Sequence, residues 1–271
     1  MDNNPDYSAP PLPASPADEP EAAVAQRAAS RSRRAFIVGG LAALAGVGGW
    51  RWLLTRPNDE GTPWPFRRVL DTNGRLSQAY FRETRLAPTF PRSKATTRQN
   101  GNVGLGSNGF DPATWRLQVQ GYAPAGTPAR VQEFTLADIK ALPRVDMTTE
   151  LKCIEGWSIV VNWVGARFSD FIEKYPLATA NGQSARYVSL VTPDEKYYVG
   201  LDLSNAVHPQ TLLCYEMNGQ PLTGPHGAPL RLVTPLKYGI KHLKRIGTIA
   251  FVDERPADYW AEQGYDWDSG H

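Results

Sequence analysis

The feature that most limits how this chain can fold is an apolar run near its N-terminus. Residues 35–50 carry no charge, and Trp52, Leu53 and Leu54 extend the run beyond Arg51. A helix that crosses a bilayer needs about 20 apolar residues, so this segment approaches a spanning length. The run therefore separates a short N-terminal part from a C-terminal part. Within a chain of 271 residues, the C-terminal part is long enough for one substantial domain.

The residues just before the apolar run resemble an export signal. The stretch Ser32, Arg33, Arg34, Ala35, Phe36 and Ile37 has the twin-arginine consensus, in which paired arginines precede an apolar segment. The alternative is a plain transmembrane helix with positive charge on its cytoplasmic side. A cleavage site at residues 43–45 would fall in mid-run, whereas Trp50 and Trp52 suit a retained interfacial anchor. We expect the protein to be exported folded by the twin-arginine machinery to the periplasmic or extracytoplasmic face of the inner membrane.

Composition divides the chain into five expected regions. These are a disordered, Pro- and acid-rich segment (1–30), the signal or anchor (31–54), a Pro- and charge-rich linker (55–75), one domain (76–260) and a C-terminal tail (261–271). The acidic, aromatic tail is expected to form an extended strap, with docking of a partner as the alternative. The formal net charge of +2 argues against a nucleic-acid partner, which would need a strongly basic face.

Short alternating segments dominate from residue 114 onward. Strands are expected within 114–121, 147–156, 186–192, 196–203, 211–217, 228–234 and 247–254, with an Asn218–Gly219 turn after the fifth. Short helices are expected at 135–142, capped by Thr135, and at 169–176, capped by Ser169, with a helical turn at 203–209. The expected class is α+β with β-structure dominant.

One of only two cysteines lies at the end of an expected strand, in the sequence Lys-Cys-Ile-Glu-Gly-Trp. Four interpretations of Cys153 compete: a disulfide with Cys214, a buried inert thiol, a catalytic nucleophile and a thiolate ligand of a metal. Cys214 lies in an apolar strand and has the surroundings of an ordinary buried thiol. The following Gly156 allows the backbone near Cys153 to approach another group closely.

A second informative stretch, residues 224–247, is rich in cations and glycine. Its cations are Arg231, Lys237, Lys241, Lys244 and Arg245, and apolar strands flank them on both sides. Cations combined with free backbone amides favour a phosphate-type anion site. The alternative is a solvated basic face.

These two stretches resemble the sulfite-oxidase-fold molybdoenzymes, and within them the catalytic subunit of the periplasmic reductases that act on methionine sulfoxide. The similarity covers residues 76–260 and implies a molybdopterin-binding fold, without the C-terminal dimerisation domain of sulfite oxidases. It implies that Cys153 is the thiolate ligand of molybdenum in a molybdenum–molybdopterin cofactor. It also places Glu155 at the catalytic centre, shaping the pocket or relaying protons, with pairing to Lys152 or Arg231 as the alternative.

The resemblance further implies a set of cofactor contacts: Arg82, Glu83, Thr192, His226, Arg231, Gly239, Ile240 and Lys241. Two positions depart from the family pattern. His226 stands where a related reductase has asparagine, and a histidine can still donate a hydrogen bond. Ala79 also replaces an asparagine and cannot substitute for its amide.

The family implies oxygen-atom transfer. Because sulfite oxidases place arginines after their cysteine, Glu155 and Trp157 favour a neutral sulfoxide, free or protein-bound, over an anion such as sulfite. A haem-containing, cytochrome b-type membrane protein is the expected redox partner, since the chain lacks its own haem-attachment or iron–sulfur cysteines. The alternatives are sulfite-oxidase-like oxidation of a small oxyanion, a cofactor-free binding protein on the same fold, and an anchored structural protein with a disulfide.

Overall fold

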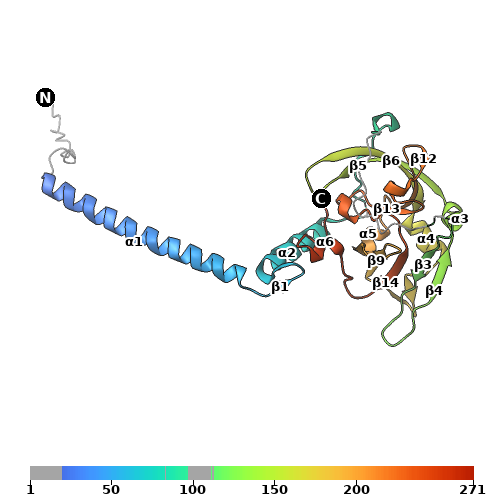
Figure 1. The fold of residues 1–271 in the computed structure, drawn as a ribbon, viewed down its shortest axis with the longest axis horizontal. Helices are drawn as coiled ribbons and strands as arrows, with labels where there is room; N and C mark the ends of the chain where they lie inside the picture. Colours follow the sequence, from blue (N-terminus) through green and yellow to red (C-terminus); the bar gives the residue numbers. More distant parts are fainter. Residues whose placement is uncertain (1–19, 83, 97–110, 112) are drawn as a thin grey trace, which may run out of the picture. The chain divides into compact units, whose positions relative to one another are not determined.

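The structure is a computed structural model that describes residues 20–82, 84–96, 111 and 113–271 (Figure 1). The chain forms two units, Met1–Arg56 and Pro57–His271, which are described separately.

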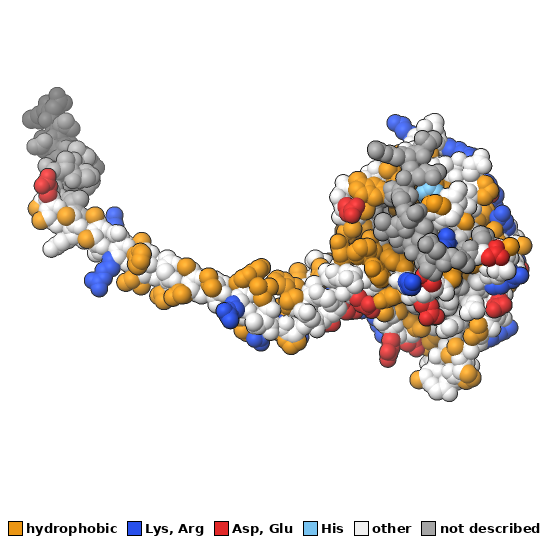
Figure 2. Space-filling view, viewed as in Figure 1, with side chains coloured by type: hydrophobic (Ala, Val, Ile, Leu, Met, Phe, Trp, Pro, Cys, Tyr) orange, Lys and Arg blue, Asp and Glu red, His pale blue; other side chains and the backbone are white. Residues whose placement is uncertain are grey.

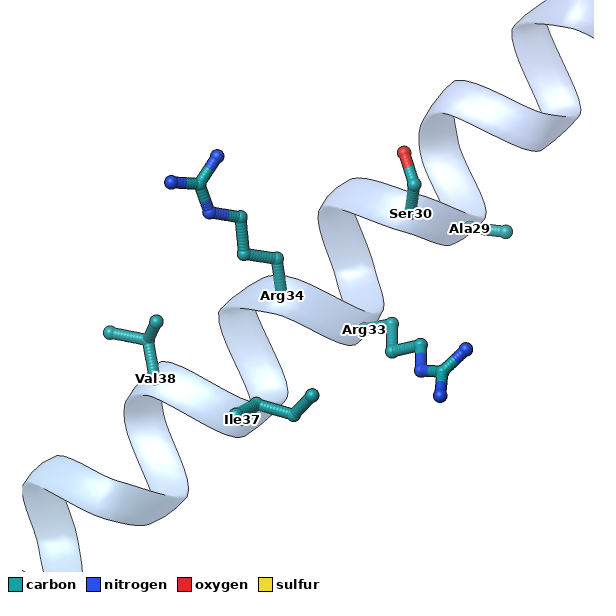
Figure 3. Close-up of a pocket in the computed structure, with 6 residues that line it drawn as sticks. All are labelled: Ala29, Ser30, Arg33, Arg34, Ile37 and Val38. Atoms are coloured by element: carbon teal, nitrogen blue, oxygen red, sulfur yellow. The ribbon is translucent and has the colours of Figure 1, made fainter.

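The described part of the first unit is dominated by one long helix, α1 (Glu21–Leu54), of 34 residues. Among the described residues, α1 is the one helix long and apolar enough to cross a membrane, judged by length and composition. Figure 2 shows hydrophobic side chains along this helix. Phe36, Leu44 and Val47 are among its exposed residues. Arg33 and Arg34 project from different sides of the helix, one turn before Ile37 and Val38 (Figure 3).

The expected disordered segment 1–30 is helical from Glu21 onward, and residues 1–19 lie outside the described part. The sequence Glu-Ala-Ala-Val-Ala-Gln-Arg-Ala-Ala accounts for this correction, because alanine, glutamine and arginine have high helix propensity.

Two five-stranded sheets form the frame of the second unit. The first has the order β10-β9-β14-β3-β4 and is antiparallel except for the parallel pair of β14 and β3. The second has the order β12-β11-β6-β5, with β13 also paired to β11. The first sheet comprises β10 (Tyr198–Asp202), β9 (Tyr187–Val191), β14 (Thr248–Val252), β3 (Leu117–Gln120) and β4 (Val131–Phe134). The second comprises β12 (Gln220–Pro221), β11 (Leu212–Met217), β6 (Ser158–Arg167), β5 (Arg144–Lys152) and β13 (Arg231–Val233).

The remaining elements are short, apart from α2. They are α2 (Trp64–Tyr80), α3 (Leu136–Lys140), α4 (Phe168–Lys174), α5 (Leu203–Ala206), α6 (Tyr259–Glu262), the 3₁₀ turns η2 (Arg92–Lys94), η3 (Gly224–His226) and η4 (Gly239–Lys241), and the two-residue ladders β1 (Asn58–Asp59) with β2 (Thr62–Pro63) and β7 (Thr179–Ala180) with β8 (Gln183–Ser184). The expected α+β, sheet-rich class is confirmed.

The main core lies between the two sheets. Leu117, Leu190 and Ile249 from the first sheet share one buried cluster with Val164 and Leu213 from the second. A smaller cluster covers the opposite face of the second sheet, around Trp163 and Cys214. Alternate residues of β6 and β11 therefore serve two cores, which leaves few polar positions on either strand.

The expected linker 55–75 is wrong over most of its length, because residues from Pro57 onward belong to the second unit. Helix α2 occupies Trp64–Tyr80, and Arg67 on its inner face is 1% exposed. The Arg67 guanidinium donates hydrogen bonds to the carbonyl oxygens of Tyr265 (2.9 Å) and Ala261 (2.6 Å). A charged residue thus anchors a segment whose composition indicated a linker.

The C-terminal residues pack onto the same unit. Trp267, Asp268 and Ser269 are buried, and the backbone N–H of Tyr238 donates to the Ser269 carbonyl at 2.9 Å. An isolated β-bridge joins Lys237 to Gly270. The tail thus packs onto the unit as a strap, but through the end of α6, turns and one β-bridge rather than in the expected extended conformation.

Most expected strands are present, and Thr135 caps α3 through a capping box. The Asn218–Gly219 turn joins β11 to β12 with positive φ at both residues. The expected Ser169 cap is wrong: α4 begins at Phe168, after Arg167, without a side-chain cap. The strand β6 and the helix α2 were not expected from the sequence.

Candidate functional site

Cys153 lies in the loop of the hairpin that joins β5 to β6. The two strands pair up to Lys152 and Ser158, and the Cys153 N–H donates to the Trp157 carbonyl at 2.8 Å. Gly156 has a φ of +88°, which glycine adopts without strain. The loop therefore holds the thiol at the end of a rigid ladder while leaving it partly accessible.

The carboxylate of Glu155 faces the thiol. Its Oε2 lies 3.7 Å from the Cys153 Sγ and accepts a hydrogen bond of 3.0 Å from the Trp157 Nε1. Among the described residues, Glu155 makes no ion pair with Lys152 or Arg231, so the pairing alternative is wrong. Partial burial, together with the charge of Glu155, raises the pKa of Cys153 above its ordinary value. A metal bound here would therefore displace a proton from the sulfur.

Both cysteines are free thiols, which contradicts the disulfide interpretation. Cys214 is fully buried in β11, opposite Gly165 and Arg231. Burial raises the pKa of the Cys214 thiol to about 12. It is an inert core residue, whereas Cys153 remains available as a ligand.

The turn η4 packs directly against the strand that carries Cys153. A β-carbon on Gly239 would lie 3.4 Å from the carbonyl oxygen of Lys152. The carbonyl of the next residue, Ile240, accepts a hydrogen bond of 2.7 Å from the Tyr197 hydroxyl. Tyr197 in turn donates its N–H to the Thr192 hydroxyl at 3.1 Å. Three predicted cofactor residues, Thr192, Gly239 and Ile240, are thus linked through Tyr197 to the backbone of Lys152, the residue before Cys153.

The side chain of Thr192 forms its hydrogen bonds within the turn that follows β9. Its buried hydroxyl donates toward Asp194 Oδ1 at 2.8 Å and the Tyr197 carbonyl at 3.1 Å. The side chain therefore shapes the connection between β9 and β10. A β-carbon on Gly247 would lie 2.7 Å from the Pro193 nitrogen, so this turn also touches the end of the cation-rich segment.

Arg231 is the centre of a buried cation cluster. Its side chain is 3% exposed, and its two terminal nitrogens donate to the carbonyls of His226 (3.2 Å) and His242 (3.4 Å). The guanidinium also stacks on the Trp163 ring at 4.8 Å. In the part of the chain that the structure describes, no carboxylate pairs with Arg231. Because a buried charge usually needs a counterion, this cluster fits an anion.

Burial changes the protonation of the neighbours of Arg231. Burial, and then the charge of Arg231, lowers the pKa of Lys244 to about 8 and of His242 to about 3. The same two causes lower the pKa of His226 below its ordinary value. At neutral pH the cluster therefore combines cationic Arg231 with neutral imidazoles that are able to donate one hydrogen bond each. His242 was not predicted to belong to this cluster, because a lone histidine carries no spacing signal.

Two lysines of the predicted anion site have other partners. Lys241 Nζ pairs with Asp258 Oδ2 at 2.5 Å and donates to the Gly200 carbonyl at 2.9 Å. Lys237 Nζ pairs with Asp268 Oδ1 at 2.5 Å. Both pairs are buried. The Lys241 side chain is thus committed to the core, and the backbone of η4 is what remains to contact a cofactor.

Three further residues were predicted to contact the cofactor: His226, Arg82 and Glu83. His226, at the end of η3, is 3% exposed and borders a pocket beside the β11–β12 hairpin with Met217 and Asn218. Arg82 is exposed in the segment after α2, where its carbonyl accepts from the Arg85 N–H. Glu83 lies outside the described residues.

The site has the donors that a pterin phosphate and a metal require. Among the described residues, Arg231 Nε, Trp163 Nε1 and His242 Nδ1 are buried polar atoms without a hydrogen-bond partner. Buried donors are normally satisfied, so the N–H groups of Arg231 Nε and Trp163 Nε1 fit a polar acceptor bound beside them. The Nε2 of neutral His242 faces the carbonyl oxygens of Thr234 and Lys237 and carries the proton, which leaves Nδ1 as an acceptor. Within the same described part there is no cluster of three or more His, Cys, Asp or Glu residues for a metal. A metal at Cys153 would therefore bring most of its ligands with it.

The chain is similar in sequence to a known family of oxidoreductases. Residues 105–260 match the family model described as the oxidoreductase molybdopterin binding domain. Over 247 residues the chain is 32% identical to a protein of Azospira oryzae provisionally named as the protein-methionine-sulfoxide reductase subunit YedZ1, covering 88% of each. It is 32% identical over 191 residues to the protein-methionine-sulfoxide reductase catalytic subunit MsrP of Burkholderia mallei, covering 62% of this chain and 55% of MsrP. The chain thus spans most of the first relative and about half of the second.

Among solved structures, the chain is similar to the sulfane dehydrogenase SoxCD of Paracoccus pantotrophus. The TM-score is 0.48 at 17% identity, over 64% of this chain and 46% of SoxCD.

Proposed function

The chain belongs to the family of oxidoreductases with a molybdopterin-binding domain, and we propose that it reduces a sulfoxide with electrons from a membrane redox partner. As a member it is a molybdenum oxidoreductase that uses molybdenum–molybdopterin. The observation that carries the sulfoxide proposal is the Cys153 loop, where a carboxylate and an indole stand beside the thiol.

The residues that would hold the cofactor follow from their contacts. Cys153 would supply the thiolate ligand, a soft donor suited to this metal. Arg231, with His226 and Lys244 beside it, would bind the anionic end of the pterin. The backbone of Gly239 and Ile240 would line the space between the two, held in place by Tyr197 and Thr192. Arg82 and Glu83 would complete the site from the segment after α2.

When bound, the molybdenum centre supplies two-electron oxygen-atom transfer. Reduction of a sulfoxide to a sulfide consumes two electrons and two protons and releases the oxygen as water. Glu155 is the carboxylate placed to deliver a proton to that oxygen, because its Oε2 already lies 3.7 Å from the ligand sulfur. The Trp157 N–H fixes the orientation of the carboxylate, and the ring provides an apolar wall for the substrate.

The charge of the loop favours a neutral substrate. A sulfite dianion would meet the Glu155 carboxylate, and like charges in close contact disfavour binding. A sulfoxide is neutral, so the Glu155 carboxylate does not repel it, and its oxygen can accept a proton that Glu155 relays. Methionine sulfoxide, free or in a protein, is the substrate class we propose; the curated relatives carry names of this activity.

Electrons must come from another protein. The chain has only two cysteines and no C-x-x-C-H sequence, so it lacks the usual haem-attachment and iron–sulfur ligands. We propose a cytochrome b-type membrane partner on the periplasmic side of the inner membrane. The paired arginines Arg33 and Arg34, which lie within α1 before its apolar run, support export by the twin-arginine route, and α1 has the length and composition of an anchor.

A substrate comparison tests this function. Purified, molybdenum-loaded protein would be assayed for reduction of methionine sulfoxide with a reduced viologen dye, and for oxidation of sulfite with a soluble electron acceptor. We expect sulfoxide reduction to exceed sulfite oxidation in kcat/KM by at least tenfold. Sulfite oxidation without sulfoxide reduction would instead support an oxidase of a small oxyanion.

A further inference from the structure

Helix α2 exposes an apolar stripe on the face that points away from the domain. Val69, Leu76 and Tyr80 are 58%, 64% and 70% exposed. Their spacing of seven and four residues places them on one line of a helix with 3.6 residues per turn. The buried residues of α2, Arg67 and Gly74, lie on the opposite side by the same geometry. The stripe is therefore not the edge of the inward face but a second, separate apolar surface.

Arginines border this stripe. Arg68 and Arg75 are exposed on one flank, and the Arg68 guanidinium lies 4.8 Å from the centre of the Trp64 ring. Asp71 is the one acidic residue in α2, and it faces the domain, where it pairs with Arg255 at 3.2 Å. The outward side of α2 also carries the exposed neutral residues Thr72 and Asn73, so it combines apolar, neutral polar and cationic side chains with no carboxylate.

We propose that this stripe rests on the surface of an anionic lipid bilayer, with Val69, Leu76 and Tyr80 in the interfacial layer and the arginines against the lipid phosphates. This inference rests on the proposed membrane location of the protein. An apolar face bordered by cations, with aromatic residues at both ends of the helix, is the usual pattern of a helix that lies in a membrane interface.

The sequence keeps α2 within reach of such a surface. Nine residues separate the end of α1 from the start of α2, and nine extended residues span at most about 30 Å. If α1 crosses the membrane, α2 cannot leave its vicinity. The positive charge of Arg68 and Arg75 complements anionic headgroups, which attract basic residues near the surface.

The dimensions of the stripe favour lipid over a protein partner. Its three side chains extend along about 16 Å of helix at 1.5 Å per residue. A stable protein interface buries roughly 800 Å² per partner, far more than three side chains of one helix supply. A bilayer needs no such matching area, because every exposed apolar residue of the stripe enters the same lipid layer.

The contact would bring the cofactor site into a fixed relation with the membrane. A β-carbon on Gly74 of α2 would lie 3.4 Å from the β-carbon of Asp268. Asp268 pairs with Lys237, two residues before Gly239 of η4. Helix α2 is thereby joined through the C-terminal strap to the turn that packs against the Cys153 strand.

A spin label tests the proposal on the full-length, molybdenum-loaded chain. Leu76→Cys would carry a nitroxide in vesicles of phosphatidylcholine and phosphatidylglycerol, and the collision rates of the label with oxygen and with a water-soluble nickel chelate would be compared. Val131→Cys is the matched control, because Val131 is 57% exposed on β4, outside the stripe. Unsubstituted protein reports any labelling of Cys153 or Cys214. Carbonate extraction separately shows whether α1 is inserted.

We expect the oxygen-to-nickel ratio at position 76 to be several-fold higher than at 131. The ratio should fall in purely neutral vesicles and in a variant that also carries Arg68→Gln and Arg75→Gln. Equal, aqueous values at 76 and 131 in anionic vesicles would overturn the proposal, whether or not α1 is inserted. If position 76 contacts lipid but α1 is not inserted, the result would support the lipid contact of α2. It would also show that α1 is not the membrane anchor assumed in the proposed function.

Discussion

The sulfur of Cys153 lies 3.7 Å from Oε2 of Glu155, and that same oxygen accepts the N–H of Trp157 at 3.0 Å. Under the proposed function, these three residues of one hairpin loop would supply a metal ligand, a proton relay and an orienting group. The β5–β6 ladder, paired from Arg144 to Lys152, supports the loop from below. A loop fixed in this way is pre-organised for chemistry.

Replacing Glu155 by glutamine should separate catalysis from cofactor binding. Glu155→Gln keeps the side-chain shape but removes the transferable proton. We expect kcat/KM for methionine sulfoxide to fall roughly 10²-fold, with molybdenum content unchanged. Glu150→Gln is the control, since Glu150 is also a loop-proximal carboxylate but bonds to Ser158. Equal losses in the two variants would refute a specific role for Glu155.

The buried pair of Lys241 and Asp258 should be important for folding. Asp258→Ala would leave the Lys241 ammonium buried without its counterion and would remove the cap of α6, where Asp258 accepts from the Ala261 N–H. We expect a loss of about 3–5 kcal/mol in the free energy of unfolding, measured by denaturant titration. Asp253→Ala, which removes a partner of Tyr122 near the surface, should cost less than about 1 kcal/mol. Similar values for both would contradict a buried, paired Lys241.

Acid should destabilise the fold through buried histidines. Burial lowers the pKa of His242 to about 3 and of His271 to about 4, below the ordinary histidine value of about 6.5. The unfolded chain therefore binds protons more readily than the folded one between these values. Their contribution to stability is fully present above about pH 6.5 and is lost as the pH falls toward 3 or 4.

One variant tests whether His242 causes this pH dependence of the unfolding free energy. The slope of unfolding free energy against pH, measured between pH 6.5 and 4, should be smaller in His242→Gln than in the unsubstituted protein. An unchanged slope would show that His242 is already protonated in the folded state or does not titrate in this range.

Thiol counting distinguishes the free cysteines from a disulfide. Protein unfolded in denaturant without reductant, after removal of the cofactor, should react with two equivalents of a thiol reagent, because Cys153 and Cys214 are both free. Before unfolding, buried Cys214 should be unreactive. Recovery of a peptide linking the two cysteines under non-reducing conditions would contradict the structure.

Local patterns predicted much of the sheet framework. Strands such as β9 and β14 alternate buried and partly exposed residues, and the capping box of α3 is readable from Thr135 and Asp138. By contrast, β6 was not predicted, because both of its faces are buried along most of its length and the sequence shows no alternation. Helix α2 was mistaken for a linker because its key inward residue is Arg67, an arginine that bonds to carbonyls far away in sequence.

In the candidate site, too, some residues were predictable from the sequence and others were not. Cys153, Glu155 and Arg231 were predicted from the family resemblance. In the structure, Gly239 of η4 lies against the Lys152 carbonyl, next to Cys153, and Arg231 bonds to the carbonyl of His242, the residue after η4. The partners of Lys237 and Lys241 were not predictable, because Asp268 and Asp258 lie 31 and 17 residues away. Local spacing identified a cluster of cations, but only tertiary packing decides which cations are neutralised within the protein.

The most direct test of this account is molybdenum per protein by elemental analysis, for unsubstituted protein, Cys153→Ser and Cys214→Ser prepared side by side. Cells with intact pterin synthesis should yield near-stoichiometric metal in the unsubstituted and Cys214→Ser proteins. Cys153→Ser should lose the metal or change its spectroscopic signal. Well-folded, unsubstituted protein without molybdenum, or equal metal and identical spectra in all three, would contradict the assignment of Cys153 as the ligand.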